Sequence, residues 1–398
     1  MKITVAIPFL NSSKELDVLE ARYADAEVMR VYLMDVDSFQ GRPTQALWLD
    51  GAVDGFHHLL ENTGKPEDKV TSAEWRAYSR KLKEQSVLAN PSSLAKPDQR
   101  RVDSFVEDVL SQCLKHNPTW ITVPQLPIVS DSSRNKMNLA LARATNRWRS
   151  DQGFKGQLVF PLVFTHQSQL KGSTQWRPKL TSAAKTCEEA AATVVWAVDS
   201  SLTDSKGSRD TLHRRFKALV SFHEDLREYF SQHQVVGGPY WGMNLVLWAR
   251  RLCDRPAVSL GGPYRYYISG GRTQRGTVRA AIGAIRRWVE AGPELGPWLA
   301  SALQNLAPGE PVYTEMKRLS REFSRVPPKR LARSQVSAFY KAWLDSIEKV
   351  PADGRALALY QDLSSAFVLA RRLPPLPSSE APGRDPSVVA EQLMLNCL

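Results

Sequence analysis

QVVGGPY at residues 234–240 and VSLGGPY at residues 258–264 are two copies of one pattern, in which a short apolar run leads into Gly-Gly-Pro-Tyr. The residues between the two copies, 241–252, are typical of a helix. A strand, a glycine corner and a returning helix form one β/α unit, and here the unit is repeated. Successive β/α units predict a parallel sheet with helices packed on its faces.

The glycine corners also indicate a binding site. A glycine pair permits positive φ and leaves no Cβ between the backbone and a ligand, and the following proline ends the strand. The tyrosine that closes each corner would offer a ring face and a hydroxyl group at the rim. Ligands of β/α folds bind at the carboxyl ends of the strands, so two neighbouring corners predict one wall of a site. The alternative is that these glycines serve only the close packing of consecutive units.

The same rhythm of apolar strands and amphipathic helices covers much of the chain, and it favours a closed (β/α)8 TIM-like barrel over an open doubly wound sheet. Residues 1–274 would form this α/β barrel, with a polar helical insertion at about 42–103. Residues 275–398 would form a basic helical extension without strands after Thr277. Its helices are expected at 277–291, 295–305, 312–323, 334–349 and 356–372. The other strands are expected at 3–9, 28–34, 120–123, 157–164 and 193–198.

Composition favours an anionic partner, because the chain of 398 residues carries a net charge of +12. Nucleic acid comes first and a membrane surface second. The four cysteines lie far apart and the amino terminus has no apolar leader, so we expect a cytoplasmic protein without a structural zinc or another cofactor. The chain has no Walker loop and no GxGxxG or GxSxG motif, which disfavours nucleotide, dinucleotide and α/β-hydrolase chemistry.

Polar residues that follow the strands suggest carboxylate chemistry on a sugar-linked base. Asp35, Asp37 and Asp199 are the catalytic candidates, since an oxocarbenium-like transition state requires a carboxylate beside the sugar carbon. For Asp199 the alternative is a helix N-cap. The residues expected to read or stack on a planar base are Gln40, Gln125, Gly237, Gly238, Tyr240, Gly261, Gly262 and Tyr264. The residues expected to contact the nucleic-acid backbone are Arg265, Arg272, Arg275, Arg318 and Arg321.

Two patches of the sequence resemble a known family. LMDVDSFQ at residues 33–40 is similar to the Asp-Ser-Gly-Gly-Phe-Gln motif of the tRNA-guanine transglycosylases, and Val236-Gly237-Gly238 is similar to their Gly-Gly corner. The resemblance implies a (β/α)8 barrel that cleaves a base–ribose bond through an aspartate, with Asp35 matching the leading Asp of the motif. It also implies relatives that act on DNA, some of them in phage defence. The sequence departs from the family in having Asp37-Ser38 within the motif and no cysteine cluster for zinc.

Together these features predict an enzyme that cleaves the N-glycosidic bond of a base in nucleic acid, with DNA favoured over tRNA. A glycosylase is favoured over a base-exchanging transglycosylase because only part of the transglycosylase motif is present. Asp35, Phe39 and Gln40 match it, whereas Asp37-Ser38 replaces its Gly-Gly. Two further alternatives are a non-catalytic nucleic-acid-binding barrel and a small-molecule enzyme that uses the glycine corners as a phosphate site.

Overall fold

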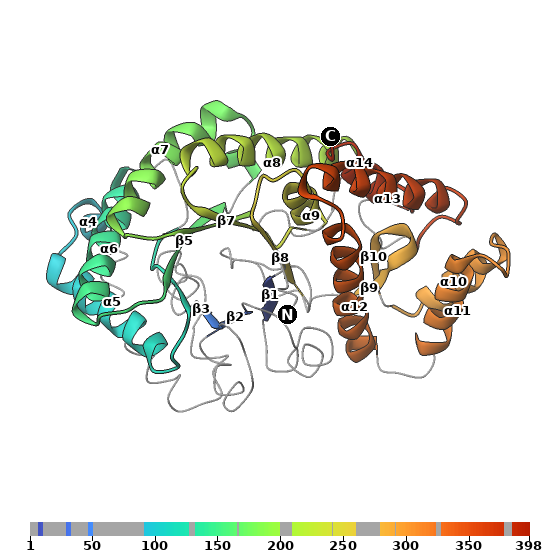
Figure 1. Cartoon of the computed structure of the whole chain (residues 1–398), viewed down its shortest axis with the longest axis horizontal. Coiled ribbons are helices and arrows are strands. Elements are labelled where there is room, and N and C mark those ends of the chain that lie inside the picture. The colour runs from blue at the N-terminus through green and yellow to red at the C-terminus, as the bar shows by residue number, and fades with distance from the viewer. Residues whose placement is uncertain are drawn as a thin grey trace.

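The computed structural model describes residues 7–10, 29–32, 47–50, 91–126, 132–164, 167–199, 209–240, 242–259, 279–290, 292–323, 328–377 and 384–398. Eight short parallel strands in these ranges pair in chain order, and the first also pairs with the eighth. They are β1 (Ile7–Leu10), β2 (Met29–Tyr32), β3 (Leu47–Asp50), β4 (Trp120–Thr122), β5 (Gln157–Phe164), β6 (Val194–Asp199), β7 (Gln234–Gly237) and β8 (Arg255–Ser259). Figure 1 shows this curled sheet with helices along its outer side. The prediction of an α/β fold built on a parallel sheet is confirmed.

The strands are apolar on both faces because both faces are covered. In β5 every residue after Gln157 is buried. Side chains alternate along each strand, so one set faces the outer helices and the other faces the interior of the sheet. Val195 and Ala197 belong to the large core shared with the helices, whereas Val194, Trp196 and Val198 belong to a separate interior cluster.

Three indole rings meet in this interior cluster. Trp48 of β3 lies 5.7 Å from Trp120 of β4 and 5.5 Å from Trp196 of β6, measured between ring centroids. The Trp48 Nε1 donates a 2.9 Å hydrogen bond to Thr122 Oγ1. The part of the interior lined by the described side chains of β3 to β8 is therefore packed, and a ligand of this part of the sheet would bind at its rim.

The outer helices follow from their apolar stripes and their caps. They are α4 (Pro91–Ala95), α5 (Gln99–Leu114), α6 (Ser132–Asp151), α7 (Ser173–Glu189), α8 (Arg209–Tyr229) and α9 (Met243–Ala249), with a 3₁₀ turn, η5 (Gln167–Leu170), before α7. Asp98 starts α5 by accepting hydrogen bonds from the backbone N–H groups of Arg100 and Arg101. The expected stripes of α5 and α8 are buried, which confirms the helical period read from the sequence.

Strand β3 corrects the prediction that residues 42–103 are a helical insertion. Its four residues pair in parallel with β2 on one side and with β4 on the other, so they belong to the sheet. A four-residue strand is too short for its alternation to stand out in the sequence. The helix expected to start at Thr71 lies outside the described residues.

A second correction concerns the residues after Thr277, where strands do occur. In place of a helix at 277–291, β9 (Arg279–Ile282) and β10 (Arg287–Glu290) form an antiparallel pair around the 3₁₀ turn η6 (Gly283–Ile285). Arg286 closes the turn in the left-handed region, at φ 50°. The apolar residues of 277–291 fit both periods, and pairing across a tight turn selects the strand.

The remaining expected helices are confirmed, although the one expected at 334–349 begins earlier, at Pro328. They are α10 (Leu295–Gln304), α11 (Pro311–Phe323), α12 (Pro328–Glu348) and α13 (Arg355–Ala370), with the 3₁₀ turn η7 (Ala352–Gly354) before α13. One more helix, α14 (Val388–Met394), packs against α13 and α8 near the carboxyl terminus (Figure 1). Trp343 of α12, Leu359 of α13 and Leu393 of α14 belong to the same apolar core as the helices around the sheet. No helix in the described ranges is both long and apolar enough to cross a membrane.

Candidate functional site

The order of the strands brings several predicted segments to one side of the sheet. Strand β1 lies between β8 and β2, and β7 is the other neighbour of β8. Phe9 of β1 is level with Ser259 at the end of β8 and with Arg30 of β2. Because the strands are parallel, all four carboxyl ends point the same way.

The first glycine corner packs against the helix layer. A Cβ on Gly237 would lie 3.1 Å from the Sγ atom of Cys253 and 3.8 Å from Nε2 of His223 on α8. Gly238 has φ +99°, and its carbonyl oxygen accepts a 2.7 Å hydrogen bond from the Trp196 indole. Both glycines therefore have a packing role where the chain leaves β7.

Tyr240 is also a structural residue in this arrangement. Its side chain is 1 % exposed, and its hydroxyl donates a 2.7 Å hydrogen bond to the carbonyl oxygen of Ala197. The ring meets His223 edge to face, with centroids 5.6 Å apart. Burial lowers the pKa of His223 to about 4, so this imidazole is neutral at pH 7. The expected exposed ring face at residue 240 is therefore replaced by a buried anchor for the corner.

Gln125 turns away from the interior of the sheet. It is 2 % exposed, and its Nε2 donates a 3.0 Å hydrogen bond to the backbone carbonyl of Asn138 on α6. It lines a small cavity between strand β5 and the helices α6 and α7, together with Lys179. Burial lowers the pKa of Lys179. The structure thus separates Gln125 from the first glycine corner.

The other predicted residues fall at the rim or beyond the described ranges. Asp199 is the last residue of β6 and is level with Phe164 of β5. The predicted residues that lie outside the described ranges are Asp35, Asp37, Gln40, Gly261, Gly262, Tyr264, Arg265, Arg272 and Arg275.

One rim carboxylate was missed from the sequence. Asp50 ends β3, is 4 % exposed and is level with Tyr32, the last residue of β2. It lies on the same face of β3 as Trp48, and hence on the interior side of the sheet. The signal was an apolar run that ends in Asp, Leu47-Trp48-Leu49-Asp50, which repeats the form of Val194–Asp199.

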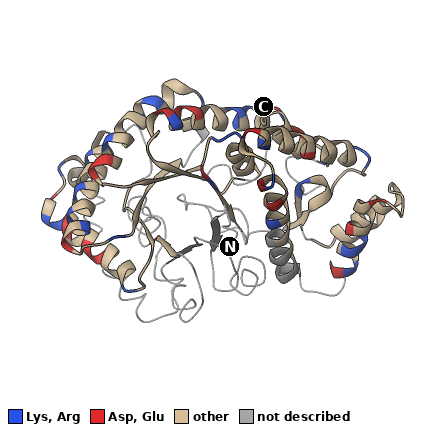
Figure 2. Ribbon diagram, in the orientation of Figure 1, with Lys and Arg blue, Asp and Glu red and all other residues tan. Residues whose placement is uncertain are grey.

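The predicted backbone-contact residues of α11 are on the surface. Arg318 and Arg321 are exposed, and Arg318 forms an ion pair with Glu322 at 2.6 Å. Along the helices drawn in Figure 2, basic and acidic residues are intermixed. The basic charge of the chain is therefore distributed among acidic neighbours in the described ranges.

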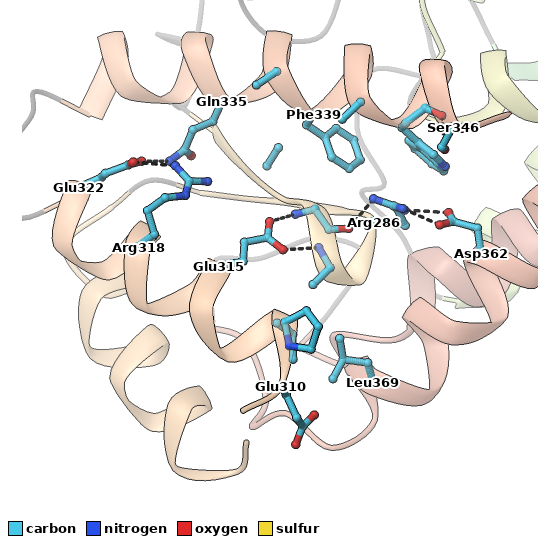
Figure 3. Close-up of a pocket in the computed structure, with 18 residues that line it drawn as sticks. Arg286, Glu310, Glu315, Arg318, Glu322, Gln335, Phe339, Ser346, Asp362 and Leu369 are labelled. Carbon is cyan, nitrogen blue, oxygen red and sulfur yellow. Dashed lines mark hydrogen bonds and ion pairs between the residues drawn. The ribbon is translucent and has the colours of Figure 1, made fainter. Parts of the chain in front are cut away.

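A groove of about 1070 Å³ lies in the C-terminal part of the chain (Figure 3). Helices α11 and α12 form its two sides, and η6 and α13 contribute its floor. Arg286 of η6's closing turn is held by Asp362 of α13 through two hydrogen bonds of 2.5 and 2.8 Å. The Arg286 guanidinium also lies over the rings of Phe339 and Trp343, at 5.7 and 5.1 Å. Sequence reasoning missed this groove because its residues come from five separate elements, β9, η6, α11, α12 and α13.

No cluster of three or more His, Cys, Asp or Glu side chains that could hold a metal ion occurs within the described ranges.

The chain was compared with known proteins, and neither a family model nor a curated protein matches it.

Proposed function

We propose that the chain is a (β/α)8-type barrel enzyme that cleaves the N-glycosidic bond of a base in nucleic acid, with DNA favoured over tRNA. The observation that supports this proposal is the strand order β7–β8–β1–β2. The segments that leave β2 and β8 begin on either side of β1, about 10 Å apart at the usual strand spacing. One segment carries Asp35 and Asp37, and the other carries Gly261 and Gly262.

The burial of two predicted base-binding residues limits which residues could recognise the base in this proposal. Tyr240 and Gln125 are buried in packing contacts, so base recognition falls to the second corner and to Gln40. The carboxylate that stabilises the sugar cation comes from Asp35 or Asp37, and Asp50 adds an acidic group at the end of the adjacent strand β3. Water would complete a glycosylase reaction, and an incoming base would complete an exchange reaction.

The test is the formation of alkali-labile abasic sites in DNA that carries normal or modified bases. Wild type is expected to form these sites. A variant that removes a carboxylate used in the reaction is expected to slow it by about 10²-fold or more. The variants to compare are Asp35→Asn, Asp37→Asn and Asp50→Asn. Asp345→Asn on the exposed face of α12 is the matched control. Incorporation of labelled guanine without abasic sites would favour the transglycosylase. The absence of both reactions would contradict the proposal.

A non-catalytic nucleic-acid-binding role is the second candidate, and it is favoured by the exposed cations Lys317, Arg318 and Arg321 on α11. For this role, Arg318→Glu with Arg321→Glu would abolish DNA binding, whereas the three Asp→Asn changes would leave it intact. DNA retention measured at two salt concentrations separates the two candidates.

A further inference from the structure

The groove between α11 and α12 contains a fixed carboxylate. Glu315 of α11 accepts hydrogen bonds from the backbone N–H groups of Gly283 at 2.8 Å and Ala284 at 3.0 Å. These two bonds hold the carboxylate against the η6 turn, as Figure 3 shows. Among the described residues, Glu315 has no ion-pair partner within 4.0 Å. It is half-buried, so a cation that enters the groove can reach it without the full screening of bulk water.

The other charges of the groove are already paired. Arg286 pairs with Asp362, Arg318 pairs with Glu322, and Glu310 pairs with Arg372. Once these pairs are counted, Glu315 supplies the net charge of the lining, and this charge is negative. The groove therefore disfavours anions such as phosphate esters.

A second acceptor and an apolar wall lie on α12. Gln335 is 7 % exposed, donates through Nε2 to Glu322, and has no hydrogen-bond partner for its Oε1 atom within the described part of the chain. Phe339 and Ala342 line the same side of the groove. A ligand that suits these groups carries hydrogen-bond donors and a positive charge at one end and an apolar body at the other.

We propose that this groove binds a small organic cation, an amine or guanidinium joined to an apolar or aromatic body. The ammonium or guanidinium group contacts the Glu315 carboxylate, and the body packs along Phe339 and Ala342. A volume of about 1070 Å³ suits a small molecule. The site is remote in sequence from the strand ends and is independent of the reaction proposed there.

Calorimetric titration of the full chain tests the proposal with matched probes. Tyramine has a cationic end and an aromatic body, agmatine has a guanidinium and an amine on an aliphatic chain, and para-hydroxyphenylacetate reverses the charge of tyramine. Tyramine or agmatine is expected to bind, and para-hydroxyphenylacetate is expected to bind at least about tenfold more weakly.

Two variants locate the binding in the groove. Glu315→Gln removes the charge and is expected to weaken binding about tenfold or more. Ala342→Trp fills the groove from an exposed position without touching the hydrogen bonds of Glu315, so it decides the matter if Glu315→Gln does not fold. The matched control is Ala300→Trp, at an exposed position of α10 outside the lining, and it is expected to bind like wild type.

The proposal is overturned if neither tyramine nor agmatine binds. It is equally overturned if para-hydroxyphenylacetate binds as tightly as tyramine, or if Ala342→Trp binds like the Ala300→Trp control. Because no nucleic acid is present in this experiment, its failure would leave the proposed glycosidic activity unaffected.

Discussion

The indole Nε1 of Trp196 donates a 2.7 Å hydrogen bond to the carbonyl oxygen of Gly238. Trp196 belongs to the interior cluster of the sheet, and Gly238 is the residue at which the chain leaves β7 with φ +99°. This bond connects the packed interior to the first glycine corner. Two side chains thus hold the corner in place. The Trp196 indole bonds to Gly238, and the Tyr240 hydroxyl donates a hydrogen bond to the carbonyl oxygen of Ala197 on β6.

Replacement of Trp196 by Phe should lower the free energy of unfolding by about 1–3 kcal/mol, because a buried carbonyl loses its donor and the smaller ring leaves a void. Urea unfolding followed by circular dichroism measures the change. Trp298→Phe, which removes a 3.1 Å bond to the Pro374 carbonyl in the C-terminal core, is the comparison. A loss below about 0.5 kcal/mol at Trp196 would show that the indole bond does not support the corner.

Gly237→Ala should destabilise the protein by about 1–3 kcal/mol, because the new methyl group meets the Sγ atom of Cys253 at 3.1 Å. The double variant with Cys253→Ala should lose less than the sum of the two single changes, since removal of the sulfur makes room. Gly296→Ala on α10 is the control, with open space around the added methyl, and it should be neutral or slightly stabilising. Additive losses at Gly237 and Cys253 would contradict the packing explanation.

The neutral His223 makes stability depend on pH. Burial lowers its pKa from 6.5 to about 4, so the unfolded chain binds a proton that the folded chain rejects between these two values. The contribution is therefore fully present above pH 6.5 and is lost as the pH falls towards 4, by up to about 3 kcal/mol. His223→Gln should flatten the slope of unfolding free energy against pH in this window, whatever its effect at pH 7. An unchanged slope would mean that other groups cause the acid sensitivity.

The Arg286–Asp362 pair should stabilise the floor of the C-terminal groove. Both side chains are less than a quarter exposed, and the pair has two hydrogen bonds, so Asp362→Ala should cost about 1–3 kcal/mol. A double-mutant cycle with Arg286→Ala isolates the interaction. The exposed Lys341–Asp345 pair of α12 serves as the reference and should give a coupling of no more than about 0.5 kcal/mol. Equal couplings for the two pairs would contradict the role assigned to Arg286.

Much of the fold was predictable from local patterns. The long apolar run of β5 and the apolar stripes of α5 and α8 can be read from residues that are close together in the sequence. The strand at Leu47–Asp50 was missed because four residues do not establish an alternation, and only pairing with β2 and β4 makes them a strand. The residues of β9 and β10 were expected to form a helix. The spacing of apolar residues within one segment does not show that this segment will pair with another strand.

The candidate site was less predictable than the fold. The pattern GGPY indicated that a corner follows β7, and a corner is there. The sequence did not show that Gly237 packs against Cys253. It also did not show that the Tyr240 hydroxyl donates its hydrogen bond to the carbonyl oxygen of Ala197. Both contacts join residues that are distant along the chain. The groove that contains Glu315 gave no sequence signal for the same reason.

The sequence by itself determined the α/β class, most of the β/α units and the helices α10 to α13, because hydrophobic period and turn chemistry act over a few neighbouring residues. Only the tertiary structure decided that Trp48, Trp120 and Trp196 meet inside the sheet, and that β1 lies between β8 and β2. It also decided that Gly237 packs against Cys253 and that Glu315 lines a groove. These features depend on which surfaces meet after folding, and burial and hydrogen bonding between distant residues select among arrangements that the local sequence permits equally.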